Sequence, residues 1–264
     1  MDYTEGMLKE IQGLFAEGTA YESVIGQNKN DHKIKITDIA ISKVPYVNYP
    51  DLSSEECSKL HELEVLLLGL SQKENNNNEV AITYRLYKEP NETEEDRIAI
   101  VYGDEHEVDL GADTKTFHLL QSERLAVINM HNHPNCSNFS LYDVSFFLRN
   151  DSVKLLILLS NKGELNYLSK GEDYSRMHNV ALFINAFKTV APDAVHDTVI
   201  DLEKISVSEM TKATNIWIKQ AKQYGITYEH VLNSERSVEH DCARKEETNP
   251  KRTAKTRDFD EWER

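Results

Sequence analysis

The sequence predicts an α/β protein. Segments in which apolar residues recur every three or four positions, as in helices, alternate with short apolar or alternating runs, as in strands. The run at residues 125–130 is almost entirely apolar and is therefore expected to form a central strand covered on both faces. Two further runs, at residues 154–160 and 164–169, flank Asn-Lys-Gly, a sequence typical of a hairpin turn.

The N-terminal region is expected to add one helix and one strand. Residues 4–17 have the spacing of an amphipathic helix. At residues 33–41 isoleucines alternate with polar and charged residues, which favours a strand. Pro45 and Pro50 then interrupt the pattern.

A helix is predicted after Ser53. Ser53 and Glu56 have the spacing of a capping box, in which each side chain bonds the other residue's backbone N–H. Leucines at three- and four-residue intervals predict that one face of this helix is buried: Leu60, Leu63, Leu67 and Leu70. Residues 73–78, which include four consecutive asparagines, are expected to form a turn that buries nothing.

The elements that follow are expected to alternate between strands and helices. Residues 80–87 and 98–102 are predicted strands joined by an acidic turn. Helical spacing is found at 114–122, 141–149, 173–189 and 202–223.

Four segments are expected along the chain. Residues 1–50 form an N-terminal helix and strand extension, and residues 51–170 form the core. Residues 171–232 contribute C-terminal helices. Residues 233–264 are mostly charged, with almost no aliphatic side chains, and are expected to be a disordered tail.

Composition excludes several classes of partner. The 264 residues include 30 Lys plus Arg and 45 Asp plus Glu, a formal net charge of −15. Nucleic-acid binding and attachment to anionic lipid both require a basic surface, so neither is expected. No apolar run is long enough to span a bilayer, and the acidic start is unlike a secretory signal. Three dispersed cysteines do not form a disulfide framework, so a cytoplasmic protein is expected.

Two histidines and a carboxylate are candidate metal ligands. His131 and His133 lie where the central strand ends, and residues i and i+2 of a strand point to the same side. His-x-His alone is a weak signal, because such histidines are commonly solvated or hydrogen-bonded. Ser140 and Asp143, however, have capping-box spacing, which would hold the Asp143 carboxylate on a first helical turn facing the strand end. Two imidazoles and one carboxylate, with a fourth position for water, are expected of catalytic zinc, and we expect one Zn²⁺ per chain.

A hydrolytic zinc site also needs a general base. Glu79 directly precedes the predicted strand at 80–87. If that strand lies beside the histidine strand, Glu79 can reach a metal-bound water. Glu74 is the competing candidate, but its position near the helix end or in the turn is less defined.

A Glu leading into a strand, followed by His-x-His-Pro and then Ser-x-x-Asp, resembles the motif of the JAMM zinc metallopeptidases, also called MPN or JAB. The resemblance covers residues 53–170, within the segment 51–170. The sequence His-Asn-His-Pro is most similar to that of bacterial members, namely the RadC-type branch and the JAB domains of phage and toxin proteins. The closely spaced Phe-Ser-x-x-Asp favours the second group. The loop between Pro134 and Ser140 is one residue shorter than in the commonest eukaryotic versions, so the substrate groove can differ.

The resemblance implies a fold and a mechanism. The fold is a three-layer α/β core with a mixed, curved sheet, distantly like that of cytidine deaminases, here with extra helices at both ends. His131, His133 and Asp143 would bind zinc, Glu79 would be the general acid/base, and Ser140 would help to stabilise the oxyanion. The substrate would be a peptide or isopeptide bond in a protein or peptide, with ubiquitin-like proteins known as substrates in the family. Nothing in the sequence identifies the substrate or the oligomeric state.

Three other functions have less support. A zinc nucleoside deaminase would require Pro-Cys-x-x-Cys, and the chain has no Cys-x-x-Cys. A catalytically silent MPN-type scaffold for protein assembly would be expected to lack ligands, whereas all are present here. A RadC-like DNA-associated role rests on the relative alone, and the acidity of the chain opposes it.

Overall fold

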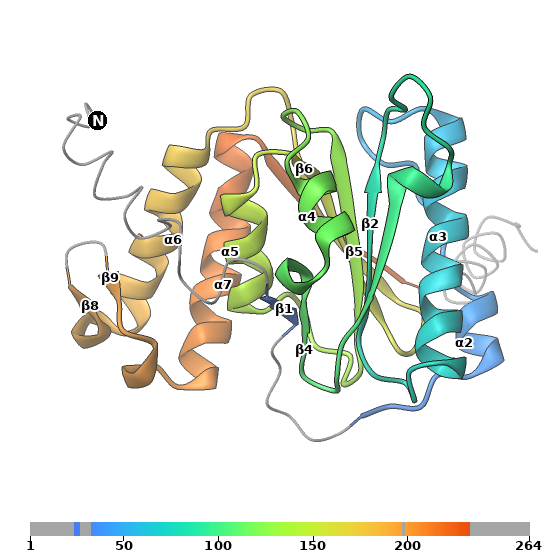
Figure 1. The fold of residues 1–264 in the computed structure, drawn as a ribbon. Coiled ribbons are helices and arrows are strands. Elements are labelled where there is room, and N and C mark those ends of the chain that lie inside the picture. The colour runs from blue at the N-terminus through green and yellow to red at the C-terminus, as the bar shows by residue number, and fades with distance from the viewer. Residues whose placement is uncertain (1–23, 27–32, 197–198, 233–264) are drawn as a thin grey trace, which may run out of the picture.

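The computed structural model describes residues 24–26, 33–196 and 199–232. Within them a mixed six-stranded sheet carries helices on both faces, which confirms the predicted α/β class (Figure 1). The strand order is β10 (Ile226–Val231), β7 (Leu165–Lys170), β6 (Val153–Ser160), β5 (Val127–His133), β2 (Val80–Arg85) and β3 (Ile98–Tyr102). In this sheet β5 and β6 run parallel and the other neighbours antiparallel. The helix expected at 4–17 and the tail expected at 233–264 lie outside the described residues.

One face of the sheet is covered by α3 (Ser54–Lys73), with the short α2 (Asp38–Ser42) beside it (Figure 1). The predicted capping box is confirmed: the Glu56 N–H donates to Ser53 Oγ at 3.2 Å, and the Ser53 N–H donates to the Glu56 carboxylate at 2.6 Å. The predicted leucine stripe is also confirmed, with Leu70 partly buried and the other three buried. Because Ser53 fixes the start of α3, the register of that stripe on the sheet is set by the local sequence.

The predicted strand at 33–41 is wrong. Residues 33–37 belong to no strand, and α2 begins at Asp38. The Thr37 hydroxyl caps this helix by accepting the N–H of Ala40 at 3.1 Å. Ile39 is 62% exposed, so the alternating isoleucines do not form one buried face. Residues 33–41 have no neighbouring strand to pair with in the described part of the chain, so the alternation of their side chains does not produce a strand. The Thr37 cap instead stabilises a short helix.

The opposite face is covered by α5 (Leu141–Arg149), α6 (Arg176–Val190) and α7 (Val207–Ala221), with α4 (Thr114–Leu120) in front of the sheet in Figure 1. All four helices were predicted, although α6 and α7 begin a few residues later than expected. Ser206 and Glu209 form a capping box that starts α7, and residues 202–204 before it form a separate 3₁₀ turn. Trp217 of α7 is fully buried against Phe183 of α6, and both belong to the same hydrophobic cluster as α5.

Several strands were not predicted. The edge strand β10 pairs with β7, and two short ribbons pair β1 (Val24–Gly26) with β4 (Glu107–Asp109) and β8 (Val195–His196) with β9 (Val199–Ile200). The backbone of β1 lies against α5 and β5. In the part of the chain that the structure describes, no helix combines the length and apolar character that crossing a bilayer requires.

Candidate metal centre

Both histidines belong to strand β5, which is shifted along the chain relative to the prediction. It starts at Val127 because Leu125 has a left-handed backbone (φ 60°), and it continues to His133. Side chains alternate along it: Val127 contributes to the cluster under α5, and Ile128 and Met130 contribute to the cluster under α3. His131 and His133 follow the parity of Val127, so both imidazoles point toward α5. The whole strand is buried.

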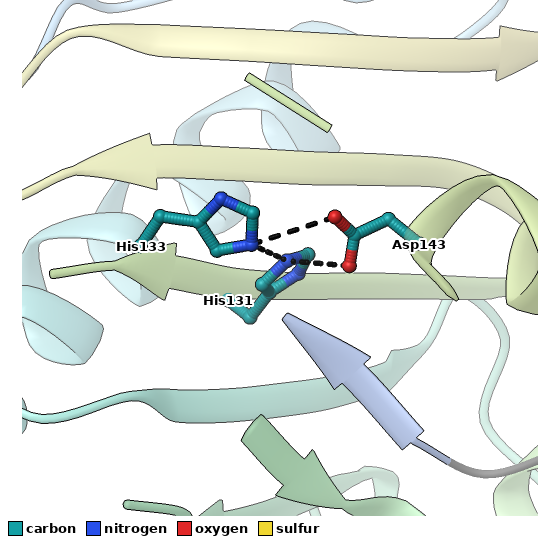
Figure 2. A group of neighbouring side chains, drawn as sticks. All are labelled: His131, His133 and Asp143. Atoms are coloured by element: carbon teal, nitrogen blue, oxygen red, sulfur yellow. Dashed lines mark hydrogen bonds and ion pairs between the residues drawn. The ribbon is translucent and has the colours of Figure 1, made fainter. Parts of the chain in front are cut away.

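The Asp143 carboxylate meets these imidazoles from the first turn of α5 (Figure 2). His131 Nε2 lies 3.1 Å from Asp143 Oδ1, and His133 Nε2 lies 3.4 Å from Asp143 Oδ2. The two Nε2 atoms are 3.2 Å apart. All three side chains are fully buried. The three residues that the sequence placed together as ligands are therefore brought together, with their ligand atoms within 4.8 Å of one another.

The spacing of the two imidazole nitrogens is close to the edge of a metal coordination tetrahedron. Bonds of about 2.0–2.1 Å at tetrahedral angles separate neighbouring ligand atoms by about 3.3–3.4 Å. The two Nε2 atoms are 3.2 Å apart, near that value, and each has one Asp143 oxygen close by: Oδ1 at 3.1 Å from His131 and Oδ2 at 3.4 Å from His133. Nitrogen and carboxylate donors in this number suit a divalent ion such as zinc. The residues present thus fit a metal ion held by three protein ligands.

The capping box predicted at Ser140 positions the carboxylate. The Ser140 N–H donates to Asp143 Oδ2 at 2.5 Å, and the Asp143 N–H donates to Ser140 Oγ at 3.1 Å. These two bonds immobilise both residues at the start of α5. Ser140 is therefore directly hydrogen-bonded to the candidate ligand Asp143.

Burial keeps the His133 ring in the neutral form that metal ligation requires. Loss of hydration lowers the pKa of His133 to about 4, although the nearby Asp143 carboxylate acts in the opposite direction. Its second nitrogen, Nδ1, lies 2.9 Å from Ser137 Oγ, the kind of contact that orients a ligating imidazole. His131 differs, because its Nδ1 has no hydrogen-bond partner among the described residues.

Glu79 lies on the same face of the sheet as the ligands. Strand β2 pairs antiparallel with β5, Ala81 opposite His131, and continuing this register by two residues places Glu79 across from His133. Glu79 is fully buried, and neither carboxylate oxygen has a hydrogen-bond partner among the described residues. Burial, followed by the negative charge of Asp143, raises the pKa of the Glu79 carboxyl well above its usual range.

The competing Glu74 is placed elsewhere. It is exposed at the C-terminal cap of α3, and its carboxylate accepts the Tyr102 hydroxyl at 2.8 Å. Glu79 is also held more firmly by its backbone, which exchanges hydrogen bonds with Asp104 and Gly103 at 2.8 and 2.9 Å. Of the two candidates, the structure brings Glu79 to the ligand face.

The asparagines next to the site have roles that the sequence analysis missed. Asn132 is fully buried between the two histidines but points to the opposite face, where its side chain accepts the Val80 N–H and donates to Asn161 Oδ1, both at 2.8 Å. Asn75, in the turn expected to bury nothing, donates to the Glu79 carbonyl at 2.7 Å. The sequence does place asparagines directly beside Glu79 and between the two histidines, and this placement could have indicated that they hold the site in position.

A scan against protein-family models and searches of curated proteins and of solved structures found no match to this chain.

Proposed function

We propose that this protein is a zinc-dependent metallopeptidase of the JAMM type that hydrolyses a peptide or isopeptide bond. One observation carries the proposal: Glu79, a buried carboxylate without a hydrogen-bond partner in the described part of the chain, lies on the face where His131, His133 and Asp143 converge. A purely structural triad has no need of a fourth, unpaired acid beside it, because burying an unpartnered carboxyl costs free energy. A hydrolytic site does need one.

His131, His133 and Asp143 would hold the zinc. The ion would supply a Lewis acid that polarises a carbonyl group and makes water more acidic. The mixed sheet with helices on both faces is compatible with the three-layer JAB/MPN-type core that we propose.

The protein's own groups would move the proton and stabilise the charge. Glu79 would accept a proton from the attacking water and deliver it to the leaving amine, a transfer for which a raised pKa is favourable at neutral pH. Ser140, fixed by its bonds to Asp143, would donate toward the oxyanion that develops on the substrate carbonyl. The products are a carboxylate and an amine.

The test is hydrolysis of a panel of linear peptides, isopeptide-linked peptides and ubiquitin-like conjugates by the zinc-loaded protein. Glu79→Gln should retain zinc and lose activity on whichever substrate the unaltered protein cleaves. Glu74→Gln, the matched control, should retain both. Full activity of Glu79→Gln would contradict the assignment of the base. Zinc binding with no hydrolysis of any substrate would favour a scaffold that uses the ion structurally.

A further inference from the structure

A pocket whose described lining residues carry no charge adjoins the candidate metal centre. Its volume is about 290 Å³. One wall is formed by residues 137–142, the loop after the histidines and the start of α5. The facing wall comes from the turn at Leu202, from Ile205 and from the first half of α7. The second wall belongs to the C-terminal region, which the JAMM resemblance does not cover.

Two serines of the pocket are hydrogen-bonded to residues of the site. Ser140 lines the pocket and also exchanges hydrogen bonds with Asp143. Ser137 lines the pocket, and its hydroxyl lies 2.9 Å from Nδ1 of His133. A chain bound across the metal centre would therefore have a neighbouring side chain at this pocket.

The lining determines the chemistry of what can enter. Charged residues make up 28% of the chain, yet the pocket is lined by Ser, Asn, Thr, Tyr and apolar side chains. Burying a charged group there would cost hydration, and none of the described lining residues offers an opposite charge to compensate. Val207 at the start of α7 is 47% exposed, an apolar side chain kept in solvent beside the pocket.

Thr214 gives a second, independent indication of a ligand. It lines the pocket and is 3% exposed, and its hydroxyl has no hydrogen-bond partner among the described residues. Threonine in a helix commonly bonds the carbonyl four residues earlier, as Thr211 does to Val207 at 2.9 Å. Thr214 does not make the corresponding bond. A buried hydroxyl without a partner is costly unless something else pairs with it.

We propose that this pocket holds an uncharged, largely apolar residue of the substrate, next to the bond that is cleaved, with its side chain against the lining and a peptide carbonyl accepting the Thr214 hydroxyl. The inference rests on the proposed peptidase function and adds the class of residue that the enzyme selects. A volume near the lower end of the usual range for ligand pockets, about 300 Å³, suits one or two residues. Helix α7 is then a specificity element.

The first measurement is binding, which requires no hydrolysis. The full chain is labelled with ¹³C-methyl methionine and titrated with N-acetyl-leucine N-methylamide or, as the charged counterpart, N-acetyl-glutamate N-methylamide. Met210 lines the pocket, whereas Met130 lies in the cluster under α3 and serves as the internal control. The leucine probe should shift the Met210 signal saturably, the glutamate probe should shift it much less at equal concentration, and Met130 should not move.

The second measurement is hydrolysis of peptides that carry leucine or glutamate on either side of the scissile bond. Cleavage that prefers leucine at one of these positions, together with the Met210 response, supports the proposal. A Met210 response without cleavage of any peptide upholds the pocket and overturns the peptidase function. No Met210 response, or an equal response to both probes, overturns the pocket assignment even if peptides are cleaved.

Discussion

Ser140 and Asp143 bond each other reciprocally, Ser140 N–H to Asp143 Oδ2 at 2.5 Å and Asp143 N–H to Ser140 Oγ at 3.1 Å. The other oxygen of the same carboxylate, Oδ1, lies 3.1 Å from His131 Nε2. One side chain therefore caps helix α5 and completes the group of candidate metal ligands. The candidate ligand Asp143 is itself part of the first turn of α5, so the helix terminus holds its carboxylate in place.

This double use of Asp143 allows stability and metal binding to be separated. Asp143→Asn keeps an oxygen that can accept the Ser140 N–H but removes the charge. We expect unfolding free energy without metal to change by less than about 1 kcal/mol and zinc affinity to fall more than about 100-fold. Ser140→Ala should lose about 0.5–2 kcal/mol of stability and only about 10–100-fold in affinity. Urea unfolding measures the stability and zinc titration measures the affinity. A larger loss of stability in Asp143→Asn than in Ser140→Ala, with a larger loss of zinc affinity in Ser140→Ala, would contradict the double role of Asp143.

Glu79 should make the stability of the metal-free protein depend on pH. Its pKa is raised in the folded state, so above its ordinary value of 4.5 the folded protein holds this proton more tightly than the unfolded chain does. Stability from this group is therefore present at low pH and is lost as pH rises through the raised pKa.

The measurement is urea unfolding in the presence of chelator from pH 4.5 upward. Relative to Glu79→Gln, the unaltered protein should lose stability as pH increases. Glu74→Gln, at an exposed position, should follow the unaltered protein at every pH. Parallel curves for the unaltered protein and Glu79→Gln would contradict the raised pKa of the Glu79 carboxyl.

Asn132 should matter more for stability than its position between two histidines suggests. Asn132→Leu leaves the Val80 N–H and Asn161 Oδ1 buried without this partner, and we expect a loss of about 2–4 kcal/mol. Asn185→Leu, at an exposed position on α6, should change stability by less than about 0.5 kcal/mol. Equal unfolding midpoints in urea for both variants would be inconsistent with an anchoring role for Asn132.

The parts of the fold that the sequence predicts correctly have local signals. The helix after Ser53 and helix α5 each begin with a capping box, and β6 and β7 flank a short turn sequence. Strand β10 was missed because its backbone is held by antiparallel pairing with β7 across the sheet and its own residues do not alternate clearly. Residues 33–41 show the opposite error, since alternation without a neighbouring strand does not form one.

The same distinction holds for the site. The i, i+2 parity of a strand and the geometry of a capping box bring His131, His133 and Asp143 together, and both rules act over a few residues. The anchoring of β5 by Asn132 and Asn161 could not be predicted, because their bond joins residues 29 apart in sequence whose proximity follows from the complete sheet. The catalytic roles of Glu79 and Ser140 stay predictions.

Metal analysis is the most direct test of the central claim that β5 and the first turn of α5 hold one divalent ion. The protein should be purified without added metal and its zinc measured per chain, alongside His131→Ala and Asp143→Ala. We predict about one zinc per chain in the unaltered protein and a loss of that zinc in both variants. A folded protein that holds no zinc even after exposure to the ion, or variants that retain it, would contradict the account.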